Sequence, residues 1–112
     1  MPAWTLKVRR GGATERSRHE SLADALAAME RRLDELATGE RRRDERFLGR
    51  EFPAATVVAA RAELRGPRGA HGGVDLHADR TTLPWTGRLR RRAVDPAPGE
   101  TSYEALARVL TW

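Results

Sequence analysis

Basic residues recur at alternate positions in several short stretches of this 112-residue chain. Alternate positions of an extended strand point to the same side of a sheet, so each stretch would present its cations on one surface. Cations held on a rigid surface can bind the phosphate groups of a nucleic-acid backbone. The candidate contact residues are Lys7, Arg9, Arg16, Arg18, Arg61, Arg65, Arg88, Arg90 and Arg92.

The overall charge agrees with a polyanionic partner but does not identify one. The chain has 21 Lys and Arg against 16 Asp and Glu, a net charge of +5, which favours DNA or RNA. Lys7 is the only lysine, and arginine-rich, alanine-rich composition also results from GC-biased coding, so arginine content alone does not indicate phosphate recognition. Exposed aromatics that would stack on unpaired bases are missing from the basic surface.

The sequence contains no clear pattern of a catalytic site or a metal site. His71 and His77, with Asp75 and Asp79 nearby, are the residues that could ligate a divalent metal, but their spacing matches no recognised ligand pattern. The carboxylates are scattered over charge-balanced faces, without an apolar setting that would raise a catalytic pKa. We therefore expect a non-enzymatic protein with no catalytic residues, no metal and no cofactor.

The segment GPRGAHGG (66–73) has two interpretations. Its glycines could form a backbone nest for an anion, but it lacks the P-loop pattern and does not lead into a helix. The simpler interpretation is a flexible loop between strands.

Composition also bounds the environment of the chain. There is no cysteine, which excludes disulfides, thiolate zinc sites and cysteine nucleophiles. The first residues form no apolar leader, and no stretch approaches the roughly 18 apolar residues of a membrane span. We expect a cytoplasmic protein without a membrane partner.

The first half of the chain predicts two strands and a helix. WTLKVRR (4–10) alternates apolar and polar residues, Gly11-Gly12 is a hairpin turn, and ATERSRHE (13–20) is a polar edge strand. Ser21 and Asp24 form a capping box before a helix that spans roughly Ser21 to Ala37, and Gly39 ends it. The apolar stripe of this helix is Leu22, Leu26, Met29, Leu33 and Leu36.

The second half predicts three strands and a shorter helix. TVVAARAEL (56–64) and VDLHAD (74–79) alternate, with Arg61, Glu63, Arg65, Asp75, His77 and Asp79 pointing away from the core. LPWTGRLRRRAV (83–94) is a third strand, and its expected core side is Leu83, Trp85, Leu89 and Ala93. Thr101 and Glu104 form a second capping box, followed by a buried stripe of Tyr103, Leu106 and Leu110.

The two halves repeat a pattern. WTLKVRR is echoed by WTGRLRR (85–91), and each stretch precedes a capped helix, SLADALA or TSYEALA. The echo predicts that Trp4 and Trp85 both lie beneath a helix. Internal duplication and convergence of two similar units both remain open. The chain is expected to form a single domain, 1–112, with pseudo-halves 3–38 and 54–112 and a charged connector 39–53.

Residues 4–29, WTLKVRRGGATERSRHESLADALAAM, resemble the AP2-like DNA-binding unit found in the arm domain of phage-type integrases. The shared features are a Trp-led basic strand, a Gly-rich turn, a polar strand and a capped Ala-rich helix. In that family a three-stranded sheet enters the major groove, so the resemblance implies that Lys7, Arg9, Arg16 and Arg18 face DNA. This chain departs from the family in having two strands before the helix, and in placing Glu15 and Glu20 among the basic residues. The strand layout of the second half is similar to double-stranded-RNA-binding and ribosome-hibernation-type α/β folds.

Together these patterns predict an α+β domain with an antiparallel sheet of about five strands, in the order ββα-βββα, and two helices on one face. The leading hypothesis is a small binding protein that contacts nucleic-acid phosphates through an Arg-rich sheet face. The alternative is a protein–protein interaction module with no nucleic-acid role. In either case the alanine-rich strand 56–64, if it lies at a sheet edge, could form a homodimer by strand addition.

Overall fold

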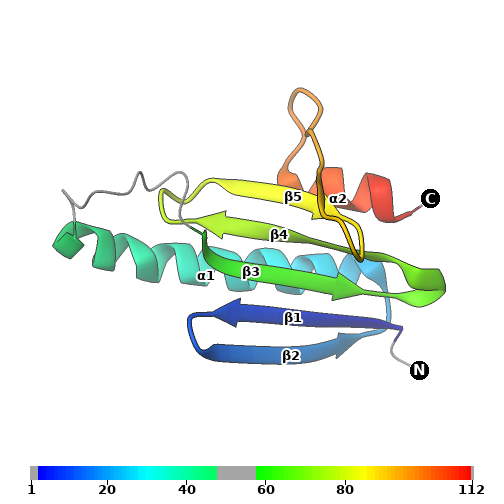
Figure 1. Cartoon of the computed structure of the whole chain (residues 1–112), viewed down its shortest axis with the longest axis horizontal. Coiled ribbons are helices and arrows are strands. Elements are labelled where there is room, and N and C mark those ends of the chain that lie inside the picture. Colours follow the sequence, from blue (N-terminus) through cyan, green and yellow to red (C-terminus); the bar gives the residue numbers. More distant parts are fainter. Residues whose placement is uncertain (1–2, 48–57, 112) are drawn as a thin grey trace.

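The computed structural model describes residues 3–47 and 58–111. These residues form one antiparallel sheet of six strands, with two helices (Figure 1). The strands are β1 (Trp4–Arg10), β2 (Ala13–His19), β3 (Val58–Arg65), β4 (His71–His77), β5 (Thr82–Thr86) and β6 (Arg92–Ala93), in the spatial order β2-β1-β3-β4-β5-β6. The predicted α+β class and antiparallel sheet are confirmed, and the sixth strand is the short β6.

Both helices pack on the same face of the sheet. Helix α1 (Leu22–Phe47) lies against β1 and β3, and helix α2 (Ser102–Leu110) lies against β4 and β5; Figure 1 shows both behind the strands. We call the opposite face, which points toward the viewer, the open face. Within the described residues, neither helix combines the length and apolar character that a membrane crossing needs.

The first hairpin and helix follow the predicted pattern. Trp4, Leu6 and Val8 are buried on the helix side, and the apolar stripe of α1 packs against them. The Ser21 hydroxyl accepts a hydrogen bond of 3.0 Å from the Asp24 amide, as expected of an N-cap.

The predicted end of the first helix at Gly39 is wrong, because α1 continues to Phe47. One glycine inside a helix costs about 1 kcal/mol relative to alanine, and the following residues, ERRRDERF, are mostly good helix formers. The remainder of the predicted connector, from residue 48, and the first two residues of the predicted strand at 56 lie outside the described residues.

Strand β3 is central, so the condition for strand addition through it, a position at a sheet edge, is not met. It pairs with β1 on one side and β4 on the other, and the edges of the sheet are β2 and β6. Ala60, Ala62 and Leu64 are buried on the helix side, as predicted. The small residues suit the central position because they let α1 approach the middle of the sheet closely.

Strands β4 and β5 pair in a register that reverses the predicted orientation of Trp85. Pro84, opposite Val74, is buried on the helix side, so Trp85 points to the open face and does not lie beneath a helix. The register places Trp85 opposite Gly73, and a Cβ built on Gly73 would lie 2.5 Å from the indole ring. The missing side chain makes room for the ring, which explains why β4 begins at His71 and includes glycines predicted to be loop.

The predicted burial of the other three core residues in this region is also wrong. Leu83 is 38% exposed and Leu89 is fully exposed, and Ala93 is exposed as well. The predicted strand 83–94 breaks at Gly87, whose φ of +114° favours glycine, and the chain returns as β6. The echo between WTLKVRR and WTGRLRR therefore does not place the two tryptophans in equivalent positions. The capping box of Thr101 and Glu104 at α2 is confirmed.

Candidate nucleic-acid interface

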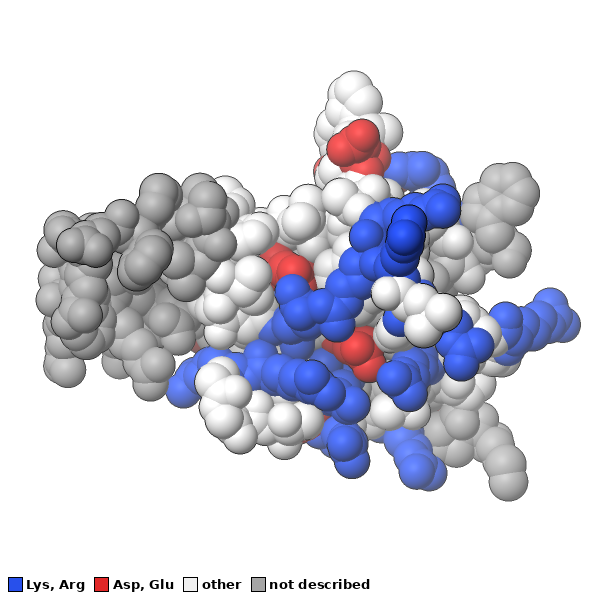
Figure 2. Space-filling view, viewed as in Figure 1, with Lys and Arg blue, Asp and Glu red and all other residues white. Residues whose placement is uncertain are grey.

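The open face collects six of the nine predicted contact residues. The registers of β2 with β1 and of β1 with β3 bring their alternating cations to one side of the sheet. Figure 2 looks onto this face and shows a broad band of Lys and Arg with acidic side chains set between them. The six residues are Lys7, Arg9, Arg16, Arg18, Arg61 and Arg65.

A groove in this face lies between the open-face side chains of β2, β1 and β3. Its volume is about 320 Å³, and its lining residues are Thr5, Lys7, Arg16, Arg18, Glu63 and Arg65. Arg65 in its wall lies 3.3 Å from the Glu63 carboxylate. Within residues 3–38 and 58–111, whose side chains the structure describes, Lys7, Arg16 and Arg18 form no ion pair. These cations are therefore available to an anionic ligand.

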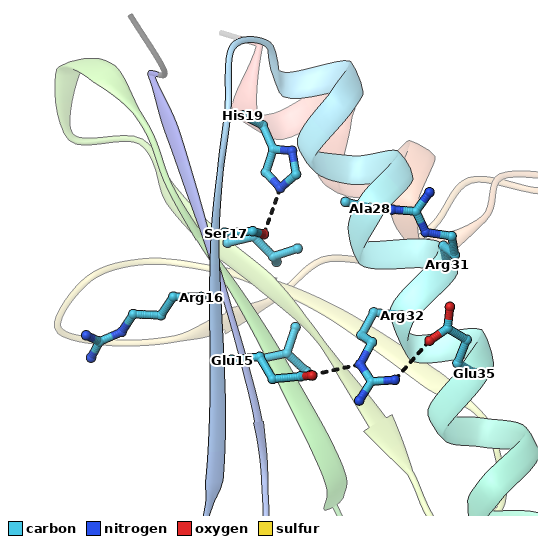
Figure 3. Close-up of a pocket in the computed structure, with 10 residues that line it drawn as sticks. Glu15, Arg16, Ser17, His19, Ala28, Arg31, Arg32 and Glu35 are labelled. Carbon is cyan, nitrogen blue, oxygen red and sulfur yellow. Dashed lines mark hydrogen bonds and ion pairs between the residues drawn. The ribbon is translucent and has the colours of Figure 1, made fainter.

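Glu15, which interrupts the basic pattern of β2 in the sequence, turns to the other side of the sheet. Its carboxylate accepts a hydrogen bond of 2.8 Å from Arg32 Nε on α1, and Arg32 also binds Glu35 at 2.9 Å (Figure 3). Figure 3 shows Arg16 on the same strand pointing away from α1. The negative charge of β2 is thus removed from the open face, and hydrogen bonding to Glu15 and Glu35 raises the pKa of Arg32.

Arg61 is on the open face but is already engaged. Its guanidinium binds the Asp75 carboxylate on β4 with two hydrogen bonds, Nε to Oδ1 at 2.7 Å and Nη2 to Oδ2 at 2.9 Å. The hydrogen bond to Asp75 is the largest influence on Arg61 and raises its pKa. Paired forks of this kind are strong and specific, so Arg61 is mainly a structural residue.

The three predicted residues after β5 are not all on the open face. Arg92 is opposite Thr86, which shares its side with the helix-facing residues of β5, so Arg92 is separated from the others. Arg88 and Arg90 are exposed in the segment between β5 and β6. Arg91, which was not predicted, extends over the open face with its guanidinium carbon 4.6 Å from the Trp85 ring centroid, a cation–π contact.

A buried polar cluster lies at the centre of the open face. The Trp85 indole donates a hydrogen bond of 3.0 Å to Asp75 Oδ1, and the His71 ring meets Trp85 edge to face with centroids 5.7 Å apart. Glu63, Asp75 and Trp85 are all buried. Cross-strand register explains the cluster, because Gly73 leaves space that these side chains fill.

Glu63 has a perturbed acidity. Burial raises its pKa, but the adjacent His71 ring and then the Arg65 and Lys7 cations lower it by more, so the pKa of Glu63 lies below its ordinary value of 4.5. The His71 Nε2 atom is 3.4 Å from Glu63 Oε2 without hydrogen-bonding alignment, so the contact is electrostatic.

The hypothetical metal ligands are dispersed. Asp75 binds Arg61 and Trp85, while Asp79 accepts hydrogen bonds from the backbone and hydroxyl of Thr81. Among the side chains that the structure describes, those of residues 3–38 and 58–111, no three His, Asp or Glu gather in a way that could hold a metal ion.

Sequence reasoning missed the Trp85–Asp75–His71 cluster and the role of Arg91. The usable signal was the Gly72-Gly73 pair inside an alternating stretch, since glycine within a strand often marks close approach by another group. Comparison of the chain with protein-family models, with curated proteins and with solved structures finds no match.

Proposed function

We propose that this chain is a non-enzymatic nucleic-acid-binding protein that contacts the phosphate backbone through the open face. The observation that carries the proposal is the groove with Lys7, Arg16, Arg18 and Arg65 in its walls. Phosphate contacts need cations on a rigid surface, and they give affinity without base sequence information.

Two features of the pairing pattern support this proposal. Glu15, the acidic residue of β2, is held by Arg32 on the helix side, so the outer strand presents only basic charge to the groove. Arg61 is held by Asp75, so the binding surface is the β2–β1–β3 side of the face. The proposed phosphate contacts are therefore made by the arginines of β2 more than by those after β5.

The test is binding to duplex DNA and duplex RNA across a salt series. The double variant Arg16→Ala/Arg18→Ala should lower the slope of log K against log salt by about 2 on DNA and weaken binding tenfold or more at low salt, roughly one unit of slope per phosphate contact. Both side chains are exposed, and substitutions at such positions usually change stability by no more than about 0.5 kcal/mol.

Arg31→Ala is the charge-matched control, because Arg31 is exposed on α1, on the other side of the sheet. It should leave the salt slope unchanged. The proposal fails if the wild-type protein does not bind at low salt, or if Arg31→Ala weakens binding as much as loss of Arg16 or Arg18 does singly.

The alternative proposal, a protein–protein interaction module, now rests on β2 instead of β3. β2 is a seven-residue edge strand, and an edge presents unpaired backbone groups that can accept another strand. Light scattering on a sizing column measures the oligomeric state. A dimer that dissociates when Arg16 is replaced by proline, which cannot donate to a strand ladder, would support pairing through β2. A monomer at all concentrations would exclude the homodimer.

A further inference from the structure

We propose that a small cleft at the β3–β4 turn, between Arg65, Arg88 and His71, binds a phosphate group, either free or at the end of a nucleic-acid strand. The second source rests on the proposed function, whereas phosphate binding by the cleft does not. The cleft is lined by Arg65, Gly66, Gly69, Ala70, His71 and Arg88.

The cleft joins two cations that are distant in the sequence. Arg65 ends β3, whereas Arg88 follows β5. Its guanidinium comes close to Gly69, where an added Cβ would lie 3.7 Å from an Arg88 nitrogen. Planar guanidinium groups bind phosphate oxygens in pairs. Two of them around one hollow form an arrangement suited to an oxyanion.

His71 supplies the independent observation. Its side chain is only 8% exposed, and among the described residues neither ring nitrogen has a hydrogen-bond partner. Nε2 has the Glu63 carboxylate 3.4 Å away, so Nδ1 is the ring nitrogen with no polar contact. An unsatisfied buried polar group is costly and calls for an explanation such as a bound ion. The ring lines the cleft, so an anion held there would be within reach of an imidazole N–H donor.

The size of the cleft selects the ligand. Its volume is about 90 Å³, several times the ~10–15 Å³ that a water molecule requires and well below the ~300–1,000 Å³ of pockets for organic ligands. A tetrahedral oxyanion matches this range. Glu63 lines the open-face groove and not the cleft, but its carboxylate lies 3.3 Å from Arg65 Nε and 3.4 Å from His71 Nε2. Arg88 is therefore the cation that a phosphate in the cleft would depend on most.

The cleft is connected with the proposed binding surface. Arg65 lines both the open-face groove and the cleft, so a strand whose backbone follows the groove could place its terminal phosphate beside Arg88. The loop that closes the cleft is GPRGA, where Gly69 has a φ of +77°. The anion-binding interpretation of this loop is therefore proposed again in a changed form, in which side chains and not backbone amides are the main donors to the anion.

The first experiment titrates isotope-labelled protein with inorganic phosphate and follows the imidazole resonances by NMR. Saturable shifts are expected at His71 and not at His19 or His77. Arg88→Ala should weaken phosphate binding about tenfold, the loss expected for one charge-assisted hydrogen bond. Arg90→Ala, which removes the same charge two residues later and does not line the cleft, should leave the affinity within about twofold. No saturable shift at His71, or equal loss in the two variants, overturns the proposal.

The second experiment identifies the source of the phosphate with two oligonucleotides of one sequence, with and without a terminal phosphate. Tighter binding of the phosphorylated strand by the wild type, but not by Arg88→Ala, assigns the cleft to strand ends. If the two strands bind equally and inorganic phosphate still gives saturable shifts at His71, the cleft is assigned to free phosphate. If the backbone proposal fails, nucleic-acid affinity will not change in the double variant Arg16→Ala/Arg18→Ala. This variant should leave inorganic phosphate binding unchanged in either case, so the two failures are distinguishable.

Discussion

Replacing Gly73 with alanine should destabilise the protein strongly, because this glycine makes room for Trp85. A Cβ at residue 73 would lie 2.5 Å from Trp85 Cζ2 and would also collide with the carbonyl oxygen of Ala62 on β3. A distance below 3.0 Å is one that real Cβ atoms essentially never show. The backbone of a central strand cannot move away easily, so the indole must shift.

The expected size follows from three contributions. Overpacking costs about 1–3 kcal/mol. A shifted indole also loses its 3.0 Å hydrogen bond to the Asp75 carboxylate, and such bonds to charged groups contribute about 1.5–3 kcal/mol. Alanine offsets about 0.4–1 kcal/mol by restricting the unfolded chain. The net loss in the free energy of unfolding is therefore about 1.5–5.5 kcal/mol, with a fall in Tm of roughly 4 °C for each kcal/mol.

Chemical denaturation with tryptophan fluorescence measures both the stability and the environment of the ring. Gly12→Ala is the matched control, since a Cβ there meets nothing within 4 Å and Gly12 has no positive φ. We expect it to be neutral or to stabilise by up to ~1 kcal/mol. If Gly73→Ala unfolds within about 0.5 kcal/mol of the wild type, the placement of Trp85 over Gly73 is wrong.

Three further changes test other contacts. Asp75→Asn should lower the free energy of unfolding by about 2–4 kcal/mol, measured by denaturation, because it breaks the paired hydrogen bonds from Arg61 and leaves a guanidinium uncompensated; an unchanged midpoint would show that the pair contributes nothing. Thr101→Ala should cost about 1 kcal/mol in the same assay through loss of the α2 N-cap, and an equal cost for Thr111→Ala, at the other end of α2, would argue against a capping effect. The lowered pKa of Glu63 contributes stability that is complete above its ordinary value of 4.5 and is lost as the pH falls through the folded-state value; Glu63→Gln should therefore lose less stability than the wild type between about pH 5 and pH 3, and parallel acid profiles would contradict this.

The alternation of residues predicts which side of the sheet a residue occupies only where a strand has one apolar face. It succeeds for β1 and for Ala60, Ala62 and Leu64 of β3, which are buried on the helix side, whereas Val58 at the start of β3 is 42% exposed. It fails for β5, because Leu83 and Trp85 are more apolar than the Thr82, Pro84 and Thr86 that actually face α2 and its neighbours. The decisive constraint is Gly73 on the adjacent strand, and a period within one segment carries no information about its partner's side chains.

The same limit explains why the sequence left the position of β3 open and why the predicted first helix was too short. Whether β3 is central depends on pairing with strands far away in the sequence, and its own pattern, alanine-rich and apolar on one face, fits either position. Gly39 is a helix terminator only when the following residues favour another conformation, since its intrinsic cost is small compared with the preference of the Glu and Arg that follow.

Structure also separates arginines that a composition cannot distinguish. Arg61 and Arg32 bind carboxylates at 2.7–2.8 Å, so their charges are neutralised locally and their replacement should act mainly on stability. Arg16 and Arg18 have no such partner among the described residues, and their replacement should act on ligand binding while the fold persists. Codon bias could fill a surface with arginine, but it would not place the only acidic side chain of β2 on the opposite side of the sheet. The opposite orientation of Glu15 and of Arg16 and Arg18 thus supports the open-face groove as the binding surface.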